Sequence, residues 1–283
     1  MRVGQDEGVT TLERRRALVN PREHGAWGML LVPLVTGAAV GLQSGREAWP
    51  VMPLTIAAVA LFWLRTPVEN WLGTLPTKAR TEAEVRLVKK AALVLAASAV
   101  AALIWLFWGG RHLGVLWLGG AAAIAVVAQA LVRQWWRKAR TAAQWIGAAG
   151  LTAVAPAAYL VVTGQMDWRG WLLWLCNFAF AANQIQCVQL RIRGAHAVSR
   201  AERVALGRGF LAAQGVLMAL LVAGCAGHVL SGYTAAAFLP ILWRGFQWFA
   251  APFRALAVHA LGLGEMRQAI VFGVLLSLSF ALG

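Results

Sequence analysis

The chain has 283 residues, of which 60% are hydrophobic and 13% are charged, and its mean hydropathy is +0.64. Soluble domains carry about a quarter charged residues, so this composition excludes an ordinary soluble protein and predicts an all-α, polytopic transmembrane helical bundle. The net charge of +15 does not indicate nucleic-acid binding, because the basic residues lie in short connections between apolar runs.

The N-terminal 20 residues are polar and lack the apolar core of a signal peptide. We interpret residues 1–20 as a flexible cytoplasmic tail and residues 21–283 as a single transmembrane helical domain. Apolar runs bounded by charge, glycine or proline then predict about nine membrane spans. These runs lie at residues 25–42, 48–64, 90–108, 113–132, 143–163, 170–190, 209–227, 229–247 and 268–283.

Two features of these runs bear on helix packing. Pro156 interrupts the fifth run, where it removes a helical hydrogen bond. Small residues are dense in the third, fourth and fifth runs, and in lipid they let helices approach closely. We therefore expect tight packing at Gly119, Gly120, Gly147 and Gly150.

The distribution of basic residues predicts the orientation. Of the 26 Lys and Arg residues, all except Arg46, Arg111 and Arg169 lie on one side of the predicted spans. The positive-inside rule makes that side cytoplasmic. We expect a multi-pass membrane protein with its N-terminus in the cytoplasm and its C-terminus outside.

Two polar clusters lie at the cytoplasmic ends of the first two runs. The first contains Arg22, Glu23 and His24. It is either a helix start capped by Asn20, or a group of ionisable side chains that must find partners at the membrane boundary. The second contains Arg65, Glu69 and Asn70. Arg65 and Glu69 are four residues apart, so the alternatives are a structural ion pair and a functional carboxylate.

A third cluster ends the sixth run. At about 100° per residue, one side of this helix carries five polar side chains, and Gln184 and Arg191 lie on another side. The five are Asn183, Gln186, Gln189, Arg193 and His196. The alternatives are interhelical hydrogen bonds with snorkelling arginines, and the wall of an internal cavity. For the three amides we favour the cavity wall.

Familiar reaction motifs are missing from the sequence. It shows no Ser-His-Asp arrangement and no His-x-x-x-His spacing, and Gly262–Glu265 lacks the strand and lysine of a phosphate loop. Cys176, Cys187 and Cys225 lie inside apolar runs, and we interpret them as small core residues. We predict no metal site, and the residues identify no cofactor.

The motif Pro-Arg-Glu-His-Gly-Ala-Trp-Gly-Met-Leu-Leu-Val-Pro at residues 21–33 resembles the start of the YwiC-like family of bacterial membrane proteins. The segment Leu-Gly-Leu-Gly-Glu at residues 261–265 fits the same family. Nine helices with the N-terminus inside also resemble the UbiA superfamily of membrane prenyltransferases, especially its menaquinone branch. Residues 160–168, which lead into the sixth run, resemble that superfamily as well. This second resemblance implies a UbiA-like architecture.

UbiA enzymes hold a prenyl diphosphate through Mg²⁺ bound to two Asp-rich motifs. Here the first motif has only Glu69 and Asn70, and the second would place Ile192 and His196 where it needs Asp. No Asp or Glu occurs from Ala181 to Ala201. Because Mg²⁺ prefers carboxylate oxygens, ordinary Mg²⁺-dependent prenyl transfer is not expected.

We therefore expect a cytoplasm-facing polar cavity that binds an amphipathic membrane lipid, of the isoprenoid, quinone or haem-like kind. The alternatives are a divergent UbiA-type transferase, a small-solute transporter, and a structural subunit of a membrane complex. The candidate ligand-binding residues are Arg22, Glu23, His24, Arg65, Glu69, Asn70, Asn183, Gln186, Gln189, Arg191, Arg193 and His196.

Overall fold

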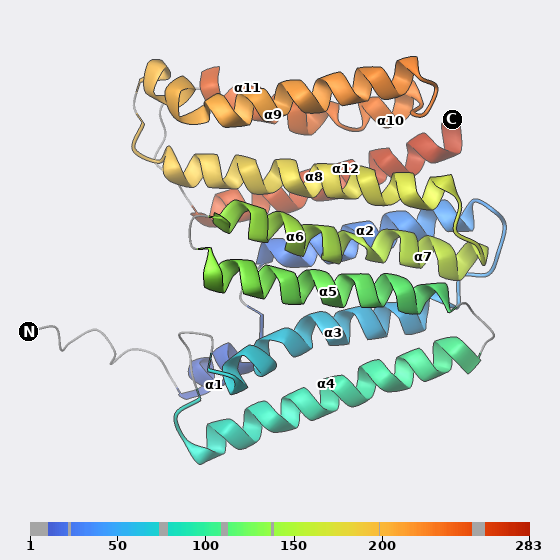
Figure 1. Cartoon of the computed structure of the whole chain (residues 1–283), viewed down its shortest axis with the longest axis vertical. Helices are drawn as coiled ribbons and strands as arrows, with labels where there is room; N and C mark the ends of the chain where they lie inside the picture. Colours follow the sequence, from blue (N-terminus) through green and yellow to red (C-terminus); the bar gives the residue numbers. More distant parts are fainter. Residues whose placement is uncertain are drawn as a thin grey trace, which may run out of the picture. The chain divides into compact units, whose positions relative to one another are not determined.

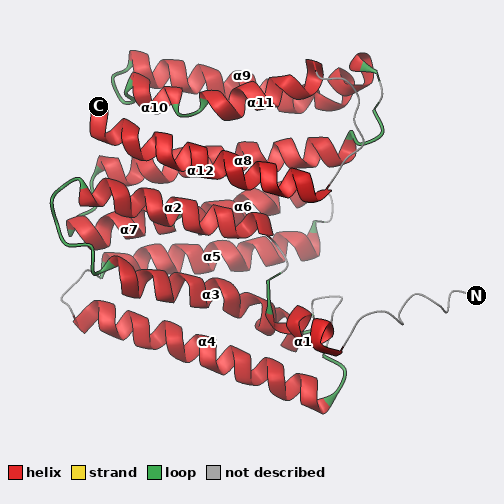
Figure 2. Ribbon diagram, turned by 180° about the vertical axis from the view of Figure 1, so that it is seen from behind, coloured by secondary structure: helices red, strands yellow, loops and turns green. Residues whose placement is uncertain are grey.

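The computed structural model describes residues 11–21, 24–73, 79–108, 113–136, 139–197, 199–250 and 258–283. Every regular element in these residues is a helix, which confirms the all-α fold class (Figures 1 and 2). The chain divides into two compact units. Unit 1 comprises Met1–His24 and Trp49–Arg111, and unit 2 comprises Gly25–Ala48 and His112–Gly283.

Unit 1 consists of α3 (Val51–Trp71) and α4 (Glu82–Trp108), which pack along each other, and the short helix α1 (Thr11–Val19), which contacts both. A helix of nine residues is not stable alone in water. Two side chains of α3 hold its C-terminal end: Asn70 Nδ2 donates to the Leu18 carbonyl at 2.7 Å, and Trp63 Nε1 donates to the Val19 carbonyl at 2.9 Å. Residues 11–19, assigned to the tail from the sequence, are therefore a docked helix.

Unit 2 contains α2 (His24–Leu42) from Gly25 onward and the helices that follow α4. These are α5 (Gly114–Trp135), α6 (Arg140–Thr152), α7 (Val154–Thr163), α8 (Trp168–Arg193), α9 (Arg200–Ala226), α10 (Gly232–Ala236), α11 (Leu239–Ala250) and α12 (Val258–Leu282). Helix α8 is central, because it contacts α6, α7, α9 and α11. Phe180 of α8 also stacks on Phe272 of α12, with ring centroids 4.1 Å apart.

Glycine permits the closest helix contacts in unit 2. A Cβ atom at Gly37 of α2 would lie 2.0 Å from the Ala155 carbonyl oxygen of α7, so no other residue fits. In α6 a Cβ at Gly150 would lie 3.0 Å from Ala125 Cβ of α5, and one at Gly147 would lie 2.6 Å from the side-chain oxygen of Gln129, which confirms two of the predicted tight contacts. At Gly119 and Gly120 the prediction is wrong, because a Cβ there would meet nothing within 4 Å.

Two of the predicted spans are interrupted helices. The fifth run becomes α6 and α7, which break at Ala153, three residues before Pro156. The eighth run becomes the five-residue helix α10 and the helix α11, with Ala237 and Phe238 between them. Irregular backbone at membrane depth is tolerated where protein surrounds it. Accordingly, the segment Thr141–Thr163 is the most deeply buried of the candidate spans.

Six helical segments in the described residues are long and apolar enough to cross a membrane. They are Val51–Trp71, Glu82–Trp108, Gly114–Trp135, Thr141–Thr163, Arg200–Ala226 and Ala260–Leu282. The other three predicted runs correspond to α2, whose apolar part Ala26–Leu42 is shorter, to the more polar α8, and to the α10–α11 pair. The chain is a multi-pass helical membrane protein.

Several helices extend further than the apolar runs predicted. Helix α4 begins at Glu82 and α9 at Arg200, eight and nine residues before the predicted starts at 90 and 209. In α9 the cause is a capping box, in which Ser199 and Glu202 satisfy each other's backbone N–H groups. Hydrophobicity locates the apolar part of a helix, whereas capping decides where it begins.

Candidate functional site

Buried amides of α8 contact three different neighbouring helices. Asn177 Nδ2 donates to Thr36 Oγ1 of α2 at 3.1 Å. Gln184 Nε2 donates to the backbone carbonyl of Glu265 in α12 at 2.8 Å. Asn183 Oδ1 accepts a long bond of 3.5 Å from Gln214 of α9. Between residues 177 and 184, α8 therefore presents buried amides to three neighbouring helices beside an apolar core that includes Leu173 and Phe180.

A buried ion pair lies next to these amides. Arg244 of α11 donates through Nη2 to Glu265 Oε1 of α12, and the two side chains are only 12% and 9% exposed. Cys187 of α8 lies within electrostatic range of this pair and of Arg191. Charges inside a membrane protein must be paired or serve a ligand, so this cluster is the strongest candidate site in unit 2.

Four buried polar atoms of unit 2 have no hydrogen-bond partner among the described residues. One is a donor, Arg191 Nε, and three are acceptors, Gln214 Oε1, Glu265 Oε2 and Gln268 Oε1. Glu265 and Gln268 are three residues apart on α12 and therefore share a face. Since a buried polar group without a partner is costly, these atoms would gain from a hydrogen bond to a water molecule or to a ligand. We call Arg191, Gln214, Arg244, Glu265 and Gln268 the polar cluster.

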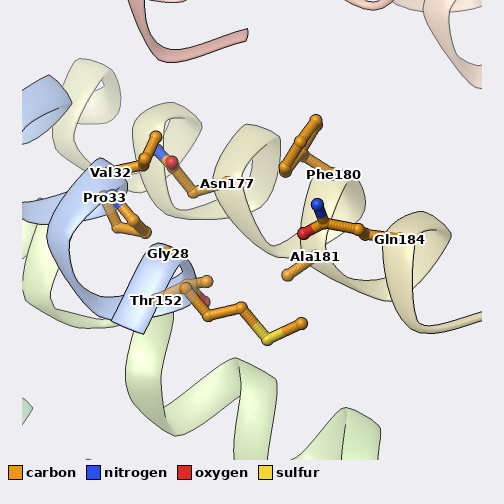
Figure 3. A pocket seen from close by; sticks show the side chains of 9 residues that line it. Gly28, Val32, Pro33, Thr152, Asn177, Phe180, Ala181 and Gln184 are labelled. Atoms are coloured by element: carbon orange, nitrogen blue, oxygen red, sulfur yellow. The ribbon is translucent and has the colours of Figure 1, made fainter. Parts of the chain in front are cut away.

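A small enclosed cavity lies between α2, α6 and α8 (Figure 3). Its volume of about 10 Å³ is room for one water molecule, and no lipid fits. Proline has no backbone N–H, so Pro33 cannot make the helical hydrogen bond to the Met29 carbonyl. For the same reason Pro156 cannot make one to the Thr152 carbonyl. Met29 and Thr152 both line the cavity, together with Gln184. The cavity thus lies where two proline interruptions leave carbonyls without their helical donors.

A separate group of polar side chains connects α8 to α6 near the end of α8. Gln189 Oε1 accepts from Thr141 Oγ1 at 2.9 Å and from Arg193 at 3.2 Å, and Gln189 Nε2 donates to Gln144. The structure therefore brings two predicted site residues, Gln189 and Arg193, together. Asn183 bonds instead to α9, so the predicted amides do not all face one neighbour.

Of the remaining predicted residues of this helix end, Arg191 belongs to the polar cluster, whereas Gln186 and His196 lie apart from these contacts. Gln186 is half-buried and no hydrogen bond is recorded for its side chain, and His196 is exposed beyond the end of α8. Arg191 is half-buried beside Cys187.

The predicted residues of unit 1 have structural contacts. Arg65 Nε lies 2.9 Å from Glu69 Oε1, which is the predicted ion pair. Asn70 is buried and holds the end of α1. Arg22 and Glu23 lie outside the described residues, and for His24 only the backbone, at the start of α2, is described. For all these residues a role in ligand binding stays a prediction.

Sequence reasoning missed Arg244, Gln214 and Gln268 as site residues, and considered Glu265 only as part of a family motif and of a rejected phosphate loop. One signal was present: Glu265 is one of 11 acidic residues in the chain and lies close to an apolar run. An acid at such a position indicates a buried partner or a functional site. Its partner Arg244 is 21 residues away, so no local pattern connects the two.

The comparisons with known proteins give one match. The model of the YwiC-like protein family matches residues 20–159, about half of the chain. The motif at residues 21–33 lies inside this match, and the segment 261–265 lies outside it. No curated protein and no solved structure matched. The UbiA resemblance stays a prediction.

Proposed function

Residues 20–159 belong to the YwiC-like family of membrane proteins, and from this premise we propose that unit 2 binds an amphipathic lipid of the isoprenoid or quinone kind. The observation that carries the proposal is the polar cluster, where buried donors and acceptors without partners lie beside an ion pair. A lipid headgroup would supply the missing hydrogen bonds while its apolar part stays in the membrane.

The distribution of charge supports a cytoplasmic location for this site. In unit 2 the C-terminal end of α8 and the N-terminal end of α9 carry Arg191, Arg193, Arg200 and Arg203, whereas the start of α8 carries only Arg169. By the positive-inside rule the arginine-rich end faces the cytoplasm of a bacterial inner membrane, with the N-terminus inside and the C-terminus outside.

An open apolar groove lies on α11, the helix that also carries Arg244. It has a volume of about 430 Å³ and is lined by Trp243, Phe246, Gln247 and Ala250 on one face of α11. Arg244 is on the adjacent part of the same helical turn, and it points to Glu265. The groove offers the apolar part of a ligand a surface next to the headgroup site.

The arrangement of carboxylates argues against ordinary Mg²⁺-dependent prenyl transfer. Glu265 is engaged with Arg244, and the polar stripe of α8 contains no acid. A hard divalent cation needs several carboxylate oxygens when it also holds a diphosphate. A divergent transferase of UbiA-like architecture is the enzymatic alternative. Incubation with farnesyl diphosphate and an aromatic acceptor, with and without Mg²⁺, tests it, and metal-dependent product would support the enzyme.

The lipid proposal is tested on the purified full-length chain. Lipids extracted from the protein are identified by mass spectrometry, and a stoichiometric isoprenoid or quinone is expected. Arg191→Met should lower its occupancy several-fold, because it removes the unpaired donor. Arg208→Met is the matched control, since Arg208 is exposed on α9. Absence of any such lipid from the wild-type protein, or equal occupancy in both variants, would contradict the proposal.

A second function, small-solute transport, is favoured by one observation. The spans α6–α7 and α10–α11 are both interrupted, and discontinuous helices at membrane depth are typical of transporter binding sites. Flux of a solute into proteoliposomes that contain the protein would support this alternative over simple lipid binding.

A further inference from the structure

The polar cluster carries information about the headgroup that it would bind. Of its four buried atoms without a partner, Glu265 Oε2 accepts in either orientation of its side chain, the amide oxygens of Gln214 and Gln268 accept in their assigned orientations, and Arg191 Nε donates. A ligand that satisfies this set must donate at least as readily as it accepts. Building on the proposed function, we infer that the headgroup is neutral and carries a hydroxyl donor, as in an isoprenoid alcohol or a reduced quinone.

The acceptors are fixed by their own helices. Gln214 is fully buried, and its Nε2 is already directed to Asn183, which leaves Oε1 as its free end. Glu265 is 7% exposed, and Arg244 engages only its Oε1, so Oε2 faces the interior without a donor. Gln268 lies on the same face of α12 as Glu265. A hydroxyl that donates to Glu265 or Gln268 relieves the cost of these buried acceptors.

Arg191 of α8 supplies the one unpaired hydrogen-bond donor of the polar cluster. Arg191 Nε is buried without an acceptor, while the Arg191 guanidinium also hydrogen-bonds to Cys187, which is within electrostatic range of Glu265 and Arg244. A hydroxyl oxygen accepts as well as donates, so one hydroxyl can bond to a carboxylate oxygen and to a guanidinium N–H. A single neutral group therefore matches both kinds of unpaired atom.

Headgroups that only accept hydrogen bonds fit less well. A diphosphate or carboxylate would satisfy Arg191, and the two arginines against one glutamate would attract it. It would still leave three acceptors unpaired and would face the free oxygen of Glu265. An oxidised quinone has the same deficiency, because its carbonyl oxygens donate nothing. A hydroxyl can donate to one of the three acceptors and an anion to none, so the hydrogen-bond count favours the hydroxyl by one bond, whereas the net charge favours the anion.

The test compares ligands that share a tail and differ in the headgroup. Farnesol and farnesyl diphosphate form one pair, and decylubiquinol and decylubiquinone form the other. Binding to the full chain in lipid nanodiscs is measured by displacement of the co-purified lipid. We expect the hydroxyl-bearing member of each pair to bind at least about fivefold more tightly, the effect of one hydrogen bond. The pair with the larger preference identifies the ligand class.

Variants connect this preference to the cluster. Gln268→Met removes one acceptor at nearly constant volume and should reduce the preference to about twofold or less. Arg208→Met on the exposed face of α9 should leave it unchanged. The wild-type comparison stands even if a variant does not fold.

The results distinguish failure of the headgroup inference from failure of the proposed lipid binding. If isoprenoid or quinone lipid co-purifies but the diphosphate or the oxidised quinone binds as tightly as its partner, the inference is overturned and the proposed function stands. If no such lipid is bound, and density at Glu265 and Gln268 shows ordered water only, both are overturned.

Discussion

Arg244 of α11 and Glu265 of α12 form an ion pair inside unit 2, where their side chains are 12% and 9% exposed. The pair joins two helices that are separated in the chain by residues 251–257. Removing one partner of a buried pair leaves an uncompensated charge, which costs more than the pair itself contributes.

We expect Arg244→Met to destabilise the protein by about 3–5 kcal/mol, because Glu265 would be left buried without its counter-ion. The double variant Arg244→Met with Glu265→Leu should recover most of this loss. Thermal unfolding in detergent measures both. A double variant as unstable as the single one would show that the pair is not coupled in this way.

A second prediction concerns the contact between α2 and α7. Gly37→Ala should destabilise the protein by about 3 kcal/mol, because the new methyl group would overlap the Ala155 carbonyl oxygen. Gly119→Ala is the control: its methyl group meets nothing within 4 Å, and alanine is the better helix former by about 0.5–1 kcal/mol. Equal melting temperatures for the two variants would contradict the close approach.

The docking of α1 gives a third prediction. Asn70→Leu removes the donor to the Leu18 carbonyl and should cost about 1–3 kcal/mol of local stability. Amide hydrogen exchange should then accelerate in residues 11–19, while α3 and α4 keep their protection. Glu82→Gln, an exposed change on α4, serves as the control and should leave exchange in α1 as it is in the wild type.

The orientation is tested by fusion reporters. Alkaline phosphatase, which folds only outside the cytoplasm, should be active when fused after Gly283 and inactive when fused after Gly194. Green fluorescent protein should give the reverse pattern. The reason is the excess of Lys and Arg on the side of Gly194. Activity of the phosphatase at Gly194 would reverse the assigned topology.

The sequence by itself determined the membrane character, the helical class and the positions of the apolar runs. These follow from composition and from charge at the span ends, which act on each segment alone. It also identified the Arg65–Glu69 pair, because four residues on a helix bring two side chains together. The apolar runs did not locate the starts of α4 and α9, because their first turns are polar and are held by reciprocal hydrogen bonds between Thr81 and Glu84 and between Ser199 and Glu202.

Only the tertiary structure decided which polar groups meet. Asn183, Gln184 and Gln189 lie within seven residues, yet they bond to α9, α12 and α6. Glu265 pairs with Arg244, which lies 21 residues earlier in the chain. A periodicity places a side chain on one face of a helix, but the neighbour on that face depends on how distant helices pack. For that reason the sequence predicted a polar stripe at the end of α8, and the packing of α9, α11 and α12 against α8 decided which of its side chains meet which partners.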